Sequence, residues 1–134
     1  MSTRAVYSFI DEHETHHVYK HHDGYPSGAA EWIEKAAAEA WPLPRFEASE
    51  FGAAFVAACR KGPGGVRLTH GPEHHGDLAY RYEIRCDGGV LMVKAFKQRT
   101  WEGWSAEKVG YEPIFLGTLA EFKAHVDRKE TATP

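Results

Sequence analysis

The sequence predicts one α+β domain, in which a single antiparallel sheet of about six strands carries three helices on one face. Two observations lead to this class. Strand-like runs lie at the start of the chain and across its second half, where apolar and polar residues alternate most clearly over 78–86. Stretches with apolar residues every three or four positions indicate two helices in the first half and one at the end. The expected order of elements is β-β-α-α-β-β-β-β-α.

The first half is expected to hold two strands followed by two helices. The strands cover 4–10 and 15–22, and Gly24 is expected to supply a positive φ in the turn that follows. The first helix begins near Pro26 and ends before Pro42, because proline cannot continue a helix. The second helix has an apolar stripe at helical spacing, which comprises Phe51, Ala54, Phe55, Ala58 and Cys59.

The second half is expected to hold four strands and a last helix. A short strand over 66–69 is followed by the clearest alternation in the chain, over 78–86. The turn Asp87-Gly88-Gly89 leads into a strand over 90–97. A sixth strand over 111–116 contains Pro113, which favours an edge position. Thr118 and Glu121 match a capping box at the start of the last helix. The domain is expected to span 1–128, with a frayed tail over 129–134.

Composition excludes several classes of protein. The 134 residues suit one domain, and the 43% hydrophobic content excludes a disordered chain. A formal net charge of −3 argues against general nucleic-acid binding, which needs a concentrated basic surface. The sequence shows neither a stretch that could span a membrane nor a signal-peptide pattern after Met1, so we expect a cytoplasmic protein.

The two cysteines are expected to be reduced core residues. Cys59 falls on the apolar stripe of the second helix, and Cys86 falls on the apolar side of a strand. Neither lies in a recognisable catalytic motif, and no GxSxG or P-loop sequence is present. Whether either cysteine acts beyond packing stays open. The residues therefore favour a binding protein over an enzyme, and no cofactor is expected.

A candidate ligand site lies around the end of the strand over 90–97. Arginine and tryptophan together can stack on a flat ring and neutralise a phosphate. Tyr25 is expected near the N-terminus of a helix, where free N–H groups favour anions. The candidate ligand-binding residues are Arg99, Trp101, Trp104, Lys97, Arg81, Arg85 and Tyr25. The alternative is an apolar cluster beneath a loop, with solvated arginines above it.

The nine histidines suggest a second, competing site. On a strand, His17 and His21 point to one face and His16 and His22 to the other, so the four cannot share one metal ion. A mixed histidine and carboxylate site could instead form from two loops. Its candidate ligands are His22, Asp23, His74, His75 and Asp77. The alternative is a polar, partly exposed histidine strand.

Three segments resemble small proteins carried by phages and prophages: 4–9 (RAVYSF), 18–26 (VYKHHDGYP) and 114–122 (IFLGTLAEF). Six expected strands with three helices, in a chain of this size, are also similar to the phage anti-Thoeris signal sponges. That resemblance implies a homo-oligomer that binds cyclic ADP-ribose-type messengers, or related cyclic oligonucleotides, without cleaving them. It assigns no residue of this chain to a binding site.

Two functional hypotheses follow. The first is a non-catalytic counter-defence protein, in the cytoplasm of a bacterial host, that sequesters a cyclic adenine nucleotide or another small anionic ligand, or that blocks a host defence protein. The second is a metal-dependent hydrolase or nuclease that uses the histidines and aspartates. A structural or assembly role in a phage is a third possibility.

Overall fold

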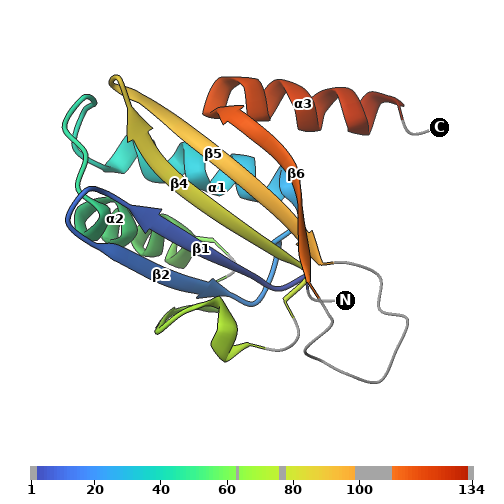
Figure 1. Cartoon of the computed structure of the whole chain (residues 1–134), viewed down its shortest axis with the longest axis horizontal. Helices are drawn as coiled ribbons and strands as arrows, with labels where there is room; N and C mark the ends of the chain where they lie inside the picture. The colour runs from blue at the N-terminus through green and yellow to red at the C-terminus, as the bar shows by residue number, and fades with distance from the viewer. Residues whose placement is uncertain (1–2, 63, 76–77, 99–109, 133–134) are drawn as a thin grey trace.

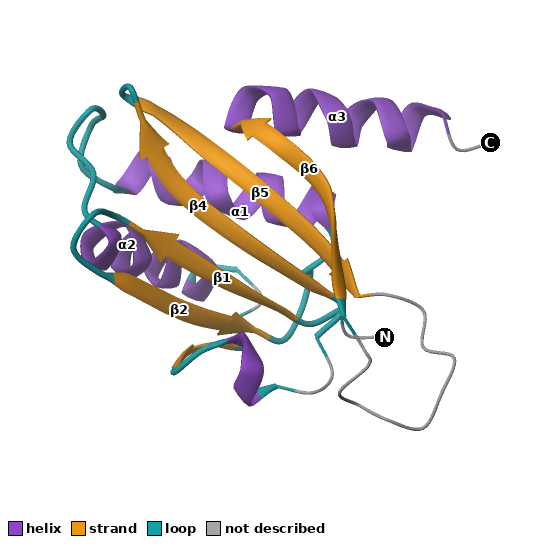
Figure 2. Cartoon of the chain, in the orientation of Figure 1, coloured by secondary structure: helices purple, strands orange, loops and turns teal. Residues whose placement is uncertain are grey.

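The computed structural model describes residues 3–62, 64–75, 78–98 and 110–132. Six strands form one sheet in the order β3-β2-β1-β4-β5-β6 (Figures 1 and 2). The strands are β1 (Ala5–Ile10), β2 (Thr15–Lys20), β3 (Val66–Thr69), β4 (Tyr80–Asp87), β5 (Val90–Gln98) and β6 (Tyr111–Thr118). The helices are α1 (Pro26–Glu39), α2 (Ala48–Arg60) and α3 (Leu119–Ala132), and a 3-10 turn, η1, covers Pro72–His74.

The sheet is mixed, which corrects the prediction of a purely antiparallel sheet. β1 and β4 run parallel, with Tyr7 opposite Tyr82, whereas the other four neighbouring pairs are antiparallel. The two helices and β3 lie between β2 and β4 in the chain, and this long connection brings β4 back beside β1 in the same direction. Parallel pairing requires such a crossover, and the alternation of a strand does not reveal the direction of its neighbour.

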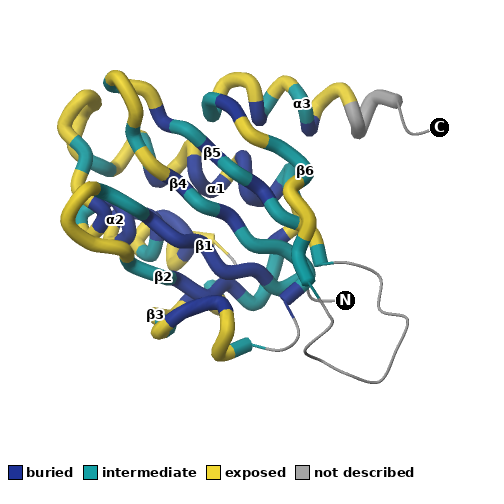
Figure 3. Tube along the Cα trace, viewed as in Figure 1, coloured by how far each residue is buried: buried dark blue, intermediate teal, exposed yellow. Residues whose placement is uncertain are grey.

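The core lies between the sheet and the three helices. In Figure 1, α1 and α2 lie behind the strands, and α3 lies beside the β6 end of the sheet. One cluster of buried side chains joins the strands to all three helices, with Tyr7, Ile33, Phe55 and Phe122 among its members. In Figure 3, buried stretches of the chain accordingly lie on both the strands and the helices. The helices thus share one face, as predicted, and we call the other face of the sheet the open face.

Several local predictions are confirmed. The predicted stripe of α2 is buried over its whole length. Gly88 and Gly89 both have positive φ, at 59° and 80°, as a tight hairpin turn requires. The Thr118 N–H donates to Glu121 Oε1 at 2.8 Å, and the Glu121 N–H donates to Thr118 Oγ1 at 3.1 Å, so the capping box forms. β6 lies at an edge of the sheet, as Pro113 indicates.

Two local details differ from the prediction. The positive φ after β2 belongs to Asp23, at 58°, and not to Gly24. Gly24 is required for space instead, because a Cβ there would lie 2.7 Å from the Thr3 carbonyl oxygen. Leu78 was expected on the apolar side of β4, but it precedes the strand and packs with Val6 on the open face.

The C-terminal helix continues to Ala132, into the segment that the sequence predicts to be frayed. The fraying itself stays a prediction. Among the described residues, no helix combines the length and the apolar character that crossing a membrane would require.

Candidate functional site

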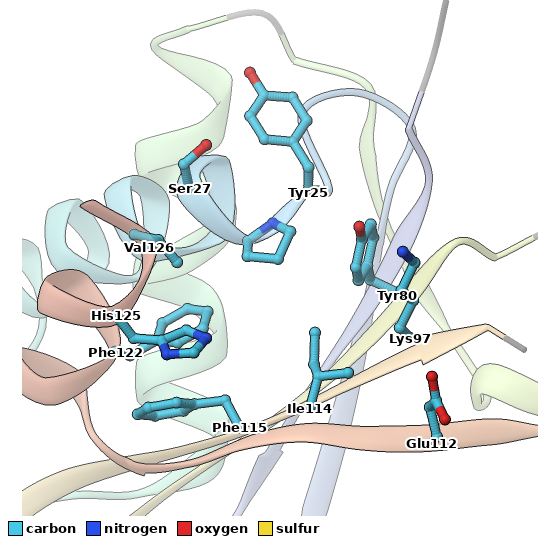
Figure 4. Close-up of a pocket in the computed structure, with 11 residues that line it drawn as sticks. Tyr25, Ser27, Tyr80, Lys97, Glu112, Ile114, Phe115, Phe122, His125 and Val126 are labelled. Atoms are coloured by element: carbon cyan, nitrogen blue, oxygen red, sulfur yellow. The ribbon is translucent and has the colours of Figure 1, made fainter. Parts of the chain in front are cut away.

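A cleft of about 450 Å³ lies where the N-terminus of α1, the strands β4 to β6 and α3 come together (Figure 4). This volume is within the range of about 300–1,000 Å³ that small-molecule sites occupy. The cleft takes residues from five elements or their ends, which are Tyr25, Pro26, Ser27, Tyr80, Lys97, Glu112, Ile114, Phe115, Phe122, His125 and Val126.

The floor of the cleft is apolar and aromatic. Phe115 of β6 lies 5.1 Å, centre to centre, from the rings of both Phe122 and His125 on α3. Figure 4 shows these three rings gathered on one side of the cleft, with Ile114 projecting into the space from β6. Phe122 is fully buried and belongs to the main core. The floor is therefore continuous with the core, and its rings can contact a flat ring of a ligand.

The opposite side of the cleft carries polar groups on paired strands. Tyr80 on β4 lies directly opposite Lys97 on β5, and Lys97 lies opposite Glu112 on β6. The side chains of Tyr80 and Lys97 rise together on this side in Figure 4. Lys97 and Glu112 are both exposed. An ammonium, a phenol and a carboxylate thus form one polar row along the mouth of the cleft.

The N-terminus of α1 forms the top of the cleft. Tyr25 is the N-cap residue with extended φ and ψ of −70° and 160°, and Pro26 occupies the first helical turn. First-turn N–H groups have no acceptor within their own helix, and the helix dipole adds a partial positive charge there. Ser27 carries one of these N–H groups at the cleft, whereas Gly28 lines a neighbouring hollow. No side-chain cap is present on Tyr25.

A second hollow of about 330 Å³ adjoins the cleft and shares Tyr25, Ser27 and Val126 with it. Its rim is acidic, because Glu31, Glu34 and Asp127 line it together with Lys123. Lys123 is also bonded to Glu34. The electrostatic character therefore changes across Ser27, from a side with one lysine and one glutamate, Lys97 and Glu112, to a side with three carboxylates and Lys123. A negatively charged group is favoured near Lys97 and disfavoured in the second hollow.

The predicted ligand-binding residues divide between two faces. Tyr25 and Lys97 both line the cleft, as the sequence analysis proposed for one site. Arg81 and Arg85 do not join them, because they alternate with Tyr80 and Tyr82 on β4 and lie on the open face. Arg99, Trp101 and Trp104 lie outside the described residues. The structure therefore places Lys97 and the two β4 arginines on opposite faces of the sheet, and the role of each in ligand binding stays a prediction.

The candidate metal ligands occupy separate settings. The rings of His21 and His22 meet edge to face, with centres 4.7 Å apart. His75 stacks on Tyr19 at 4.4 Å. His74 lies on η1, where its Nε2 is 3.8 Å from Glu73 Oε1. Asp77 lies outside the described residues, and Asp23 belongs to the turn before α1. Over 3–62, 64–75, 78–98 and 110–128, no three such side chains are grouped so that they could hold a metal ion.

Sequence reasoning missed most of the cleft. Tyr80, Ile114, Phe115 and His125 were assigned to strands or to the last helix without a role in binding. One signal was available for Tyr80. A two-residue hairpin turn at Gly88-Gly89 pairs Asp87 with Val90, and counting outward from that pair places Lys97 opposite Tyr80.

The cleft can hold a flat apolar ring on its floor and an anionic group between Lys97 and the first turn of α1. These are the two chemical features that a phosphorylated or otherwise anionic aromatic metabolite presents. No protein family, curated protein or solved structure matches the chain, so a functional proposal has to be based on the chemistry of this cleft.

Proposed function

We propose that this chain is a non-catalytic binding protein that takes a small, flat, anionic molecule in the cleft between α1, β6 and α3. The observation that carries the proposal is the position of Lys97. Its ammonium group stands beside Tyr80 at the mouth of a cleft whose floor is aromatic. A charge-assisted hydrogen bond contributes about 1.5–3 kcal/mol, and the rings supply apolar contact area.

The ligand class that we propose is a cyclic adenine nucleotide. Its base would lie over Phe115 and His125, and a phosphate would lie near Lys97 and the N–H group of Ser27. A phosphate in the second hollow is disfavoured, because it would lie beside Glu31 and Glu34. By binding such a molecule without changing it, the protein would remove a host immune signal. This role as a counter-defence protein is part of the proposal.

Calorimetry with cyclic ADP-ribose and cyclic di-AMP, on the full chain, tests the proposal. We expect binding to at least one of them, a rise in Tm, and recovery of the unchanged nucleotide after denaturation. Adenosine, which lacks the phosphate, should bind at least about tenfold more weakly because the bond to Lys97 is lost. Lys97→Gln should weaken binding of the nucleotide by a similar factor.

Lys61→Gln is the matched control. Lys61 is an exposed lysine bonded to Glu39, and it does not line the cleft. Its replacement should leave nucleotide binding unchanged. Absence of heat and of a Tm shift with both nucleotides would refute the proposed ligand class. Binding that is equal in the wild type and in Lys97→Gln would place the ligand elsewhere on the protein.

A further inference from the structure

The open face of the sheet carries a second group of charged and large apolar side chains, separate from the cleft. Over β4 to β6 no described helix covers it, since α1, α2 and α3 all pack on the opposite face and η1 lies beside β2 (Figure 1). Register places Arg81 of β4, Met92, Lys94 and Phe96 of β5, and Leu116 of β6 together on this face. We propose that the open face over β4 to β6 is a docking surface for a protein partner that presents acidic side chains around an apolar anchor.

The apolar component of the surface is solvent-accessible. The side chain of Leu116 is 68% exposed, although it projects from a strand. Leu116 and Met92 line a hollow of about 300 Å³ together with Glu83, Arg85 and Lys94. An aliphatic hollow with a charged rim is the form in which protein interfaces receive an anchoring side chain. Methionine, arginine and aromatic residues are also the types enriched in such interfaces.

The charge of the surface determines the partner that we propose. On the described strands, four lysine and arginine side chains belong to the open face, at Arg67, Arg81, Arg85 and Lys94. Two carboxylates of these strands share it, at Glu83 and Asp87, and Glu83 is bonded to Arg85 at 3.3 Å. The excess of positive charge contrasts with the chain as a whole, whose net charge is −3. A second copy docked face to face would oppose like charges, whereas an acidic surface is complementary.

The aromatic rings favour a protein partner over a nucleic acid. Single-stranded nucleic acids bind by stacking their bases on open ring faces. The Arg81 guanidinium lies 5.8 Å from the centre of the Phe96 ring and 5.2 Å from that of Tyr111. Lys94 lies 5.1 Å from the Phe96 ring as well. These cations already contact the rings, so a base would have to displace them. Acidic side chains can instead pair with the same cations in place.

Selection from a library of random 16-residue peptides, displayed on phage and panned against the full chain, tests the surface. We expect enriched peptides that combine Asp or Glu with a large apolar residue. A synthetic peptide from this set should bind the double variant Arg81→Glu/Lys94→Glu at least tenfold more weakly than the wild type. Lys61→Glu, a charge reversal on an exposed lysine away from the open face, should not change its affinity.

Leu116→Asp provides an independent test if the double variant fails to fold. The Leu116 side chain is exposed and contributes little to the core, so this variant should fold normally. It should weaken binding of the same peptide while leaving Tm unchanged.

Three results would overturn the proposal. The first is that the enriched peptides bind the double variant and Leu116→Asp as tightly as they bind the wild type. The others are binding of a 20-mer oligo(dT) that the double variant abolishes, and a dimer in light scattering that Leu116→Asp dissociates. Lys97→Gln should not affect the peptide, so failure of the cleft proposal leaves this test intact.

Discussion

The ammonium group of Lys20 lies 5.1 Å from the centre of the Trp32 ring, inside the core. Lys20 is fully buried, and its Nζ has no hydrogen-bond partner among the described residues. The strand β2 carries it to the helix-covered face, diagonally adjacent to Tyr7 on β1. A lysine at this position is unusual, because burial of an ionised group is costly unless the charge is paired.

Replacement of Lys20 with methionine should stabilise the fold. An unpaired buried ammonium costs several kcal/mol of desolvation, whereas contact with an indole ring returns about 2 kcal/mol when desolvated. Methionine retains most of the volume without the charge, so the free energy of unfolding of Lys20→Met should rise by about 1–3 kcal/mol. Urea denaturation at pH 7 measures this change.

Lys35→Met is the matched control for this substitution. Lys35 also contacts the Trp32 ring, at 4.4 Å, but its side chain is 52% exposed and is bonded to Glu31. The control should change the free energy of unfolding by less than about 0.5 kcal/mol. A loss of stability in Lys20→Met would show that the ammonium group makes a stabilising bond within the core.

Two stacked tyrosines provide the second prediction, because only one of their hydroxyls is bonded. The rings of Tyr7 and Tyr82 lie 5.0 Å apart. Tyr82 Oη donates to the Gly24 carbonyl at 2.6 Å, whereas Tyr7 Oη is buried without a partner among the described residues. Tyr82→Phe should lower the free energy of unfolding by about 1–2 kcal/mol, because the Gly24 carbonyl is left unsatisfied.

Tyr7→Phe serves as its control, and should be neutral or slightly stabilising because no bond is lost. Thermal and urea unfolding of the two variants under identical conditions gives the comparison. Equal losses in both variants would contradict the assignment of the bond to Tyr82 alone.

The sequence predicted the elements well because most of them have a strong local signal. The buried stripe of α2, the glycine turn at 88–89 and the capping box at Thr118 depend on neighbouring residues only. The parallel pairing of β1 with β4 depends on a crossover of about sixty residues, for which alternation contains no information. Leu78 lies two residues before Tyr80, so alternation would place it on the helix-covered face. It precedes the start of the strand, however, and its side chain packs on the open face.

The candidate site was predicted only in part, and for a similar reason. Tyr25 and Lys97 were recognised from their own chemistry as ligand-binding types, and both line the cleft. Phe115 and His125 look like ordinary strand and helix residues in sequence, and they become a binding floor only where α3 packs beside β6. Arg81 follows Tyr80 directly in the strand, so alternation already places the two side chains on opposite faces, as the register shows.

The buried thiol of Cys59 gives the third prediction, which concerns alkaline pH. Burial raises the pKa of Cys59 from 9.0 to about 11, although the charge of Lys20 opposes this shift. The unfolded chain therefore loses this proton first, and stability that is present below pH 9 is lost as the pH rises toward 11. Burial also raises the pKa of both Tyr7 and Tyr82, which extends the loss of stability above pH 10.

Urea denaturation at half-unit intervals from pH 8 to 11 measures the slope. Cys59→Ala should start from a lower stability at pH 8 but show a shallower decline between pH 9 and 11. Cys86→Ala, which removes the partly exposed cysteine, should leave the slope unchanged. The account of Cys59 fails if the wild type and Cys59→Ala decline in parallel over this interval.

Two helical glycines should respond to alanine in opposite directions. Gly52 lies within α2, and a Cβ there would meet only the Phe9 ring, at 3.4 Å, which is ordinary contact. Gly28 lies in the first turn of α1, and a Cβ there would lie 2.3 Å from the Asp23 carbonyl oxygen, closer than any real contact. Gly52→Ala should therefore stabilise the protein by about 0.5–1 kcal/mol through helix propensity.

Gly28→Ala should destabilise the protein by about 1–3 kcal/mol, because the added methyl group forces the turn at Asp23 away from α1. That turn also positions Tyr25 and Ser27 at the top of the cleft, so any ligand bound there should lose affinity in Gly28→Ala and retain it in Gly52→Ala. Urea denaturation gives the two stabilities, and calorimetry gives the two affinities. If Gly28→Ala were as stable as the wild type, the close approach of Asp23 to α1 would be wrong, and with it the shape of the cleft.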